Sequence, residues 1–274
     1  MSQKDNKADT HQSAEHLKYY PVCLDVAGKS CLVVGGGSVG ARKSLTLAKC
    51  GARVSVVSSA FSDEFINKTS EFMNKTNKFA SKTDKIINKI DVCNPENHTI
   101  LCIKKSYDSN DLDNKFLVIG ATNNMTLNRK IARDAHDRNI LCNIADFPEG
   151  SSFVLPSIVQ RGDLVITVST SGNSPALAKK LRKDLELQFG EEYTTFLMIM
   201  GNIRKRLLAQ NHSPEAHASI FRKLVYSDLL DRIAVGDNAG IEIILQNILG
   251  SNLVSDLISD LSNEFEYQDL ISGE

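Results

Sequence analysis

Residues 31–40 have the sequence CLVVGGGSVG, and this stretch decides the fold of the first half of the chain. Its first four residues form an uninterrupted apolar run, as a strand buried on both faces requires. The glycines then form a turn, residues 41–50 have helical spacing of apolar side chains, and Gly51 would end that helix. Residues 52–58 predict a second strand. Together these elements predict a βαβ unit.

The same criteria place further elements along the chain. We expect strands at residues 20–26, 99–103, 116–119, 140–144, 152–155 and 164–169. A helix should follow Asn124, another should follow Ser174-Pro175, and helices should continue to the end, one of them starting at Ser213-Pro214-Glu215. Residues 61–98 carry little periodicity, apart from a helical piece near 84–90. The predicted fold is α/β, with a parallel sheet first and an all-helical C-terminal part.

The glycine turn has the spacing Gly35-x-Gly37-x-x-Gly40, between a buried strand and a helix. In dinucleotide-binding Rossmann domains the first glycine permits the tight turn, the second admits the pyrophosphate, and the third lets helix and strand pack closely. The helix N-terminus supplies free N–H groups to the phosphates. We therefore predict a dinucleotide site made by Gly35, Gly36, Gly37, Ser38, Val39 and Gly40.

The residue that would identify the dinucleotide is missing. An NAD site usually has Asp or Glu at the end of the second strand, where it binds the ribose hydroxyls. This chain has Ser58-Ser59-Ala60 there, with no arginine directly following to favour a 2′-phosphate. The residues alone leave NAD and NADP open.

Asp146 follows the predicted strand 140–144. Ligands of open α/β sheets bind at the carboxyl ends of the strands, so this carboxylate should lie near the nicotinamide and could act as a general base. The alternative is that Asp146 only caps the turn before Pro148.

A hydroxyl-rich loop leads into the helix after Ser174. It consists of Ser169, Thr170, Ser171, Gly172, Asn173 and Ser174, and the basic residues Lys179, Lys180 and Arg182 follow. One interpretation is a site for an anionic substrate. The other is a well-capped helix whose basic side chains are merely solvated.

Composition excludes several other classes of protein. The net charge of −1 argues against broad nucleic-acid binding, and no apolar run is long enough to span a membrane. The six cysteines include no C-x-x-C pair, and the histidines lack ligand spacing, so we expect neither disulfides nor a metal site. The polar residues 1–17 predict a disordered tail without a signal peptide, and hence a cytoplasmic location.

Several of these stretches together resemble the siroheme synthase family of precorrin-2 dehydrogenases, some of which are also sirohydrochlorin ferrochelatases. The resemblance covers most of residues 20–190, in order. The matching stretches are 21–24, 31–43, 51–54, 120–124, 142–146, 152–157 and 169–182. Residues 61–98 match poorly, and those beyond about 190 match only in being helical.

The resemblance implies a homodimer with a Rossmann domain at residues 18–148, a dimerisation segment at 149–190 and a helical domain at 191–274. It implies NAD as oxidant, with contacts from residues 35–39, Ser59 and Ala60, and from Ala121, Thr122 and Asn123. The family often has an acid in that last stretch, where this chain has Asn123-Asn124. It also implies precorrin-2, a tetrapyrrole rich in carboxylates, as the substrate, and Asp146 as the base.

Three questions stay open at this point. The enzyme could stop at sirohydrochlorin or also insert Fe²⁺ as a second substrate. The chain could instead be a non-catalytic NAD(H) sensor, which would need neither Asp146 nor the hydroxyl-rich loop. It could also be an oxidoreductase that acts on another anionic substrate.

Overall fold

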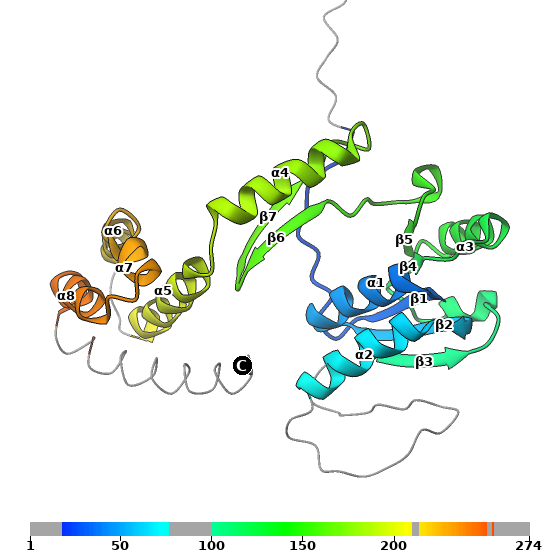
Figure 1. Ribbon diagram of the computed structural model, residues 1–274, viewed down its shortest axis with the longest axis horizontal. Coiled ribbons are helices and arrows are strands. Elements are labelled where there is room, and N and C mark those ends of the chain that lie inside the picture. The colour runs from blue at the N-terminus through cyan, green and yellow to red at the C-terminus, as the bar shows by residue number, and fades with distance from the viewer. Residues whose placement is uncertain (1–17, 77–99, 210–213, 251–253, 255–274) are drawn as a thin grey trace, which may run out of the picture. The chain divides into compact units, whose positions relative to one another are not determined.

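A computed structural model describes residues 18–76, 100–209, 214–250 and Val254 (Figure 1). The chain forms two compact units, Met1–Thr69 with Lys82–Val154 and Ser70–Ser81 with Leu155–Glu274, and each is described by itself. The expected boundaries after residues 148 and 190 are not tested by this division and stay predictions.

The first unit is built on a five-stranded, wholly parallel sheet. Its strands lie in the order β3-β2-β1-β4-β5. β2 and β3 are added on one side of β1 and β4 and β5 on the other, so the strand order reverses between β1 and β4. Their bounds are β1 Ser30–Gly36, β2 Arg53–Phe61, β3 Ile100–Lys104, β4 Leu117–Gly120 and β5 Leu141–Ile144. This is the doubly wound order of dinucleotide-binding domains, and ligands of such sheets bind at the reversal point.

Helices cover the two faces of this sheet. On one face, helix α3 (Met125–Asp137) contributes Ile131 and Ala135 to a core that also contains Leu32 and Val34 of β1. On the other face, helix α1 (Ser38–Lys49) approaches Val33, since a Cβ at Gly40 would lie 3.9 Å from its Cγ1. Successive side chains of a strand point to opposite faces. The glycine turn therefore leads into a helix whose N-terminus lies at the carboxyl edge of the sheet.

The remaining elements of the first unit are short or lie at its margin. Helix α2 (Asp63–Thr76) follows β2, while the 3₁₀ helices η1 (Ser109–Leu112) and η2 (Pro148–Gly150) lie in loops. Among the described residues of the whole chain, no helix is long and apolar enough to cross a membrane.

Most predicted elements of this unit are confirmed to within three residues, and Gly51 does end α1 with a positive φ of 80°. Two predictions were wrong. Residues 20–26 form no strand, because no strand pairs with them and Asp25 accepts a hydrogen bond from Ala27 N that turns the chain. Residues 63–76 form α2, in which Phe65 and Thr69 are buried one turn apart; the sequence analysis overlooked this amphipathic spacing. The predicted helix near 84–90 lies outside the described residues.

The second unit begins with a two-stranded antiparallel ribbon and a helix. The ribbon consists of β6 (Ser157–Arg161) and β7 (Leu164–Val168), and helix α4 (Pro175–Gln188) packs on it. Up to residue 250 the structure describes the helices α5 Glu192–Ala209, α6 Pro214–Val225, α7 Leu229–Ala234 and α8 Asn238–Leu249 after it. Their shared core includes Ile199, Ile203, Leu207, Leu224 and Leu245.

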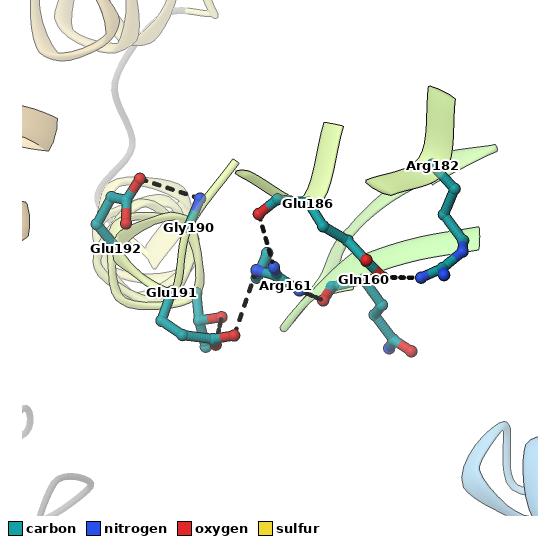
Figure 2. Close-up of polar contacts among 8 residues, drawn as sticks. Gln160, Arg161, Arg182, Glu186, Gly190, Glu191 and Glu192 are labelled. Atoms are coloured by element: carbon teal, nitrogen blue, oxygen red, sulfur yellow. Dashed lines mark hydrogen bonds and ion pairs between the residues drawn. The ribbon is translucent and has the colours of Figure 1, made fainter. Parts of the chain in front are cut away.

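Arg161 joins the ribbon to the two helices that follow it (Figure 2). Its Nη2 donates to Glu186 O near the end of α4 over 3.1 Å, and its Nη1 donates to Gln160 O over 2.8 Å. Its Nε lies 3.2 Å from Glu191 Oε1, an ion pair without hydrogen-bond geometry. The Arg161 side chain is only 18% exposed, and its contacts with Glu186 and Glu191 tie the end of α4 to the start of α5.

The helices after Ser174-Pro175 are confirmed as far as Leu249, with Ser174 as the N-cap of α4 and Pro214 as the first residue of α6, and so is the turn at Gly162. The rest of the predicted helical region, residues 251–253 and 255–274, lies outside the described residues. Ser213 lies outside the described residues. The strand predicted at 152–155 was wrong. There the hydroxyls of Ser151 and Ser152 accept hydrogen bonds from the backbone of β5, and the strand β6 begins only after Pro156.

Candidate dinucleotide site

The three fingerprint glycines have different surroundings in the turn. Gly35 has a φ of 126°, and a Cβ there would lie 2.3 Å from Ala121 O. A Cβ at Gly40 would lie 2.0 Å from Gly35 O, so this glycine lets α1 pack closely on the turn. A Cβ at Gly37 would meet no atom within 4 Å. The middle glycine thus faces open space where a ligand can approach the backbone.

The N-terminus of α1 is suited to an anion. Gly37 is its N-cap and provides no side-chain cap, and the first turn contains no acidic residue. Its first N–H groups therefore keep their hydrogen-bonding capacity, at the positive end of the helix dipole. Such a helix N-terminus suits the diphosphate of a dinucleotide, as the glycine spacing predicts.

The predicted ribose segment lies beside the glycine turn. β2 continues past Ser58 to Phe61, and its register with β1 shifts between Val57 and Phe61. Ala60 O would lie 2.4 Å from a Cβ on Gly36, and both Ser59 and Ala60 are exposed. These two residues therefore adjoin the turn at the carboxyl edge of the sheet.

The loop after β4 is held by a residue that the sequence analysis missed. Asn128 in α3 is 1% exposed; its Nδ2 donates to Thr122 O over 3.0 Å and its Oδ1 accepts from Thr122 Oγ1 over 2.7 Å. Asn124 caps α3 by accepting from Leu127 N. A sequence signal existed, because Asn128 lies on the helix face of Ile131 and Ala135. Ala121, Thr122 and Asn123 are thereby fixed opposite Gly35.

Asp146 lies in the turn that follows β5, at the same edge of the sheet. Ala145 N donates to Gly120 O over 2.8 Å and Ala121 N donates to Val34 O over 2.8 Å, which ties this turn to β4 and β4 to β1. Asp146 is exposed, with a φ of 61° that Asp tolerates better than most residues. Its carboxylate forms no hydrogen bond or ion pair with any residue that the structure describes. The geometry therefore gives no support to the turn-capping alternative.

The hydroxyl-rich loop belongs to the second unit. Ser169 Oγ accepts from Ser171 N, Thr170 Oγ1 from Ser174 N, and Ser174 Oγ from Leu177 N, all over 3.1–3.3 Å. The loop is therefore ordered by its own hydroxyls, with Ser171 and Gly172 at positive φ. Of the basic residues beyond it, Lys180 pairs with Asp184 and Arg182 with Glu186. The capped-helix interpretation thus accounts for much of this segment.

Other potential sites contribute little. A groove of about 900 Å³ between α3 and the edge strand β5 is lined by Arg129, Arg133, His136, Phe147 and Ser152, and includes no predicted site residue. Burial raises the pKa of the Cys31, Cys102 and Cys142 thiols to about 11. In the described part of the chain, no three His, Cys, Asp or Glu side chains converge as metal ligands.

Fold and site together define a dinucleotide-binding protein of the Rossmann type. In agreement, a family model described as NAD(P)-binding matches residues 22–157, and the model of the central part of sirohaem biosynthesis proteins matches residues 161–188.

Curated relatives and a solved structure point in the same direction. The chain is 32% identical over 194 residues to a siroheme synthase of Vesicomyosocius okutanii, covering 71% of this chain and 36% of the relative. It is 28% identical over 235 residues to that of Photobacterium profundum, covering 86% and 45%. The solved structure of SirC, a precorrin-2 dehydrogenase, has the same fold, with a TM-score of 0.60 at 23% identity, covering 84% of this chain and 98% of that one.

In sequence the chain is thus similar to siroheme synthases. It spans less than half the length of these curated relatives.

Proposed function

We propose that this chain catalyses the NAD-dependent oxidation of precorrin-2 to sirohydrochlorin. One observation carries the proposal: Asp146, an exposed carboxylate that pairs with none of the described residues, lies at the same edge of one sheet as a glycine turn shaped for a dinucleotide. Since neighbouring strands lie about 4.8 Å apart and Asp146 follows the second strand from β1, it lies roughly 10 Å from the turn. The names of the relatives supply the substrate.

NAD fits the residues present. Gly35, Gly36, Gly37, Ser38 and Val39 would hold the diphosphate, Ser59 and Ala60 the adenosine ribose, and Ala121, Thr122 and Asn123 the nicotinamide half. When bound, the nicotinamide ring supplies the acceptor for the hydride. The protein's task is to orient the substrate C–H bond and to remove the second hydrogen as a proton.

The proton goes to Asp146. Oxidation of precorrin-2 removes two electrons and two protons in total, of which the hydride carries both electrons and one proton. The other proton leaves a substrate C–H or N–H, and the carboxylate of Asp146 accepts it. An exposed carboxylate can then release this proton to solvent.

The hydroxyl-rich loop would bind substrate carboxylates. In each of its hydrogen bonds from the backbone, the hydroxyl of Ser169, Thr170 or Ser174 accepts, so that its own hydrogen is available to donate. Donors of this kind, followed by a helix N-terminus, suit an acidic tetrapyrrole. Ser171, Gly172 and Asn173 shape the turn between them.

The test is anaerobic incubation of the purified chain with precorrin-2 and NAD⁺, followed by Fe²⁺, with absorption spectra recorded throughout. Sirohydrochlorin and NADH should form in equal amounts. A further enzyme-dependent conversion to siroheme would add ferrochelatase activity, with Fe²⁺ as substrate. If NADH binds but precorrin-2 is not consumed, the proposal fails, and an NAD(H) sensor or an oxidoreductase for another anionic substrate takes its place.

Asp146→Ala and Asp146→Asn separate catalysis from binding. Both should lower turnover by roughly 100-fold or more, as expected for the loss of a general base. NADH affinity should change little, because Asp146 contacts the substrate rather than the dinucleotide. Normal turnover by either variant would exclude Asp146 as the base.

We also propose that the chain forms a homodimer through residues 149–190. A two-stranded ribbon with one helix is too small to bury its own apolar residues, and Ile158, Val165 and Leu177 remain 39–50% exposed. A second copy packed here would cover them. Val165→Glu should give a monomer in sedimentation equilibrium, whereas Val235→Glu, an equally drastic change at an exposed residue of the helical part, should not. A dimer that survives Val165→Glu would refute this interface.

A further inference from the structure

The groove of about 900 Å³ between α3 and β5 takes no part in the dinucleotide site, yet one of its walls adjoins Asp146. Phe147, the residue that follows Asp146, lines the groove. A Cβ on Gly150 would lie 2.4 Å from the Phe147 ring, so the ring packs closely on that glycine. Thr126, in the first turn of α3, lines the groove as well. The lining therefore reaches the carboxyl edge of the sheet, where Asp146 lies.

Two arginines form a basic stripe along this groove. Arg129 and Arg133 both line it, and both are exposed on α3. Side chains four residues apart lie on the same face of a helix. The guanidinium of Arg129 lies 5.8 Å from the centre of the Phe147 ring. Neither arginine forms an ion pair with any residue that the structure describes, so both positive charges are available to a ligand.

Two acids, Asp137 and Glu149, also line the groove. Asp137 is the last residue of α3 and lies about 12 Å from Arg129 along the helix axis. Glu149 is exposed in η2. Over the first turns of α3, the groove thus has the two positive charges of the arginines against the single negative charge of Glu149.

The proposed substrate requires positive charge near Asp146. A tetrapyrrole rich in carboxylates is strongly anionic, and the carboxylate of Asp146 is itself negative. The hydroxyl-rich loop supplies neutral donors, and Lys180 and Arg182 beyond it are paired with acids. A guanidinium binds a carboxylate through two parallel hydrogen bonds. Apolar side chains of the groove, among them Ala132 and Leu141, suit the edge of a macrocycle, and its volume lies in the range of ligand pockets.

We propose that Arg129 and Arg133 bind carboxylates of the tetrapyrrole and so position its reacting bond beside Asp146. This inference rests on the proposed function, which supplies the substrate. The two arginines bind and orient the substrate, and the proton still goes to Asp146. Their loss should therefore weaken the binding of the tetrapyrrole far more than it slows turnover at saturation.

The experiment compares the intact chain with Arg129→Gln and Arg133→Gln. Each variant should raise the KM for precorrin-2 and the dissociation constant of sirohydrochlorin roughly tenfold or more, as expected for the loss of a charge-assisted hydrogen bond. The kcat should stay within about threefold of wild type, and NADH affinity should not change. Lys130→Gln is the matched control, because its ammonium lies over the Tyr107 ring and does not line the groove. It should bind sirohydrochlorin as wild type does.

Three results would overturn the assignment. If both arginine variants bound sirohydrochlorin with wild-type affinity, the groove would not hold the substrate, while turnover by the wild type would leave the proposed function intact. If Lys130→Gln weakened binding as much as the arginine variants, the effect would come from overall charge rather than from the groove. If the wild type bound NADH but neither bound sirohydrochlorin nor consumed precorrin-2, the proposed function would fail together with this inference.

Discussion

Replacing Gly37 and Gly40 one at a time by alanine should separate dinucleotide binding from stability. A Cβ on Gly37 meets nothing within 4 Å, and its φ of −93° suits any residue. The lower capping preference of alanine costs about 0.5–1 kcal/mol, and the reduced freedom of the unfolded chain offsets a similar amount. The melting temperature of Gly37→Ala should therefore stay close to that of wild type.

Dinucleotide binding should respond in the opposite way. The added methyl of Gly37→Ala occupies space that the diphosphate needs, which weakens a hydrogen bond to a charged group worth about 1.5–3 kcal/mol. This corresponds to a dissociation constant for NADH that is roughly 10- to 150-fold higher.

Gly40→Ala gives the converse result. Its Cβ would lie 2.0 Å from Gly35 O, so the backbone must shift. Overpacking of this kind costs about 1–3 kcal/mol, a loss of roughly 2–12 °C in melting temperature for a chain of this size.

Isothermal titration with NADH and thermal unfolding followed by circular dichroism measure both quantities. Gly201→Ala is the matched control, because Gly201 lies in α5 with open space around it and alanine should only stabilise that helix. If Gly37→Ala bound NADH within about threefold of wild type, the diphosphate would not lie on this turn, and the reasoning from the glycine geometry would be refuted.

Four further predictions concern stability and reactivity. Asn128→Ala should cost about 1–3 kcal/mol in denaturant unfolding, because it removes both hydrogen bonds that the buried Asn128 side chain forms with Thr122; unchanged stability would contradict this. Arg161→Met should lower the melting temperature without altering NADH affinity, since it releases only the joint between α4 and α5; a parallel loss of affinity would argue against a purely structural function. In a Cys93→Ser background, Cys93 being outside the described residues, a thiol reagent at pH 8 should label Cys23 and Cys50 alone in the folded protein. The buried thiols hold their protons more tightly when folded, with a pKa near 11 against an ordinary value of 9.0, so the free energy of unfolding should fall as the pH rises from about 9 to 11; a flat pH profile there would contradict their burial.

The amino-acid sequence by itself determined the features that depend on local chemistry. The apolar run 31–34 and the glycine spacing that follows determine strand, turn and helix, because only glycine fits at Gly35 and Gly40. Ser174 and Asn124 marked the starts of their helices in the sequence, because a capping side chain acts within three residues of its own position.

Only the tertiary structure decided what depends on distant partners. Residues 20–26 have strand-like composition but form no strand, because a strand exists only where another pairs with it. Likewise, Lys104 comes beside Ser58 through the register of two strands 46 residues apart along the chain. Propensity acts over a few residues, whereas pairing and burial join residues that the linear sequence keeps apart.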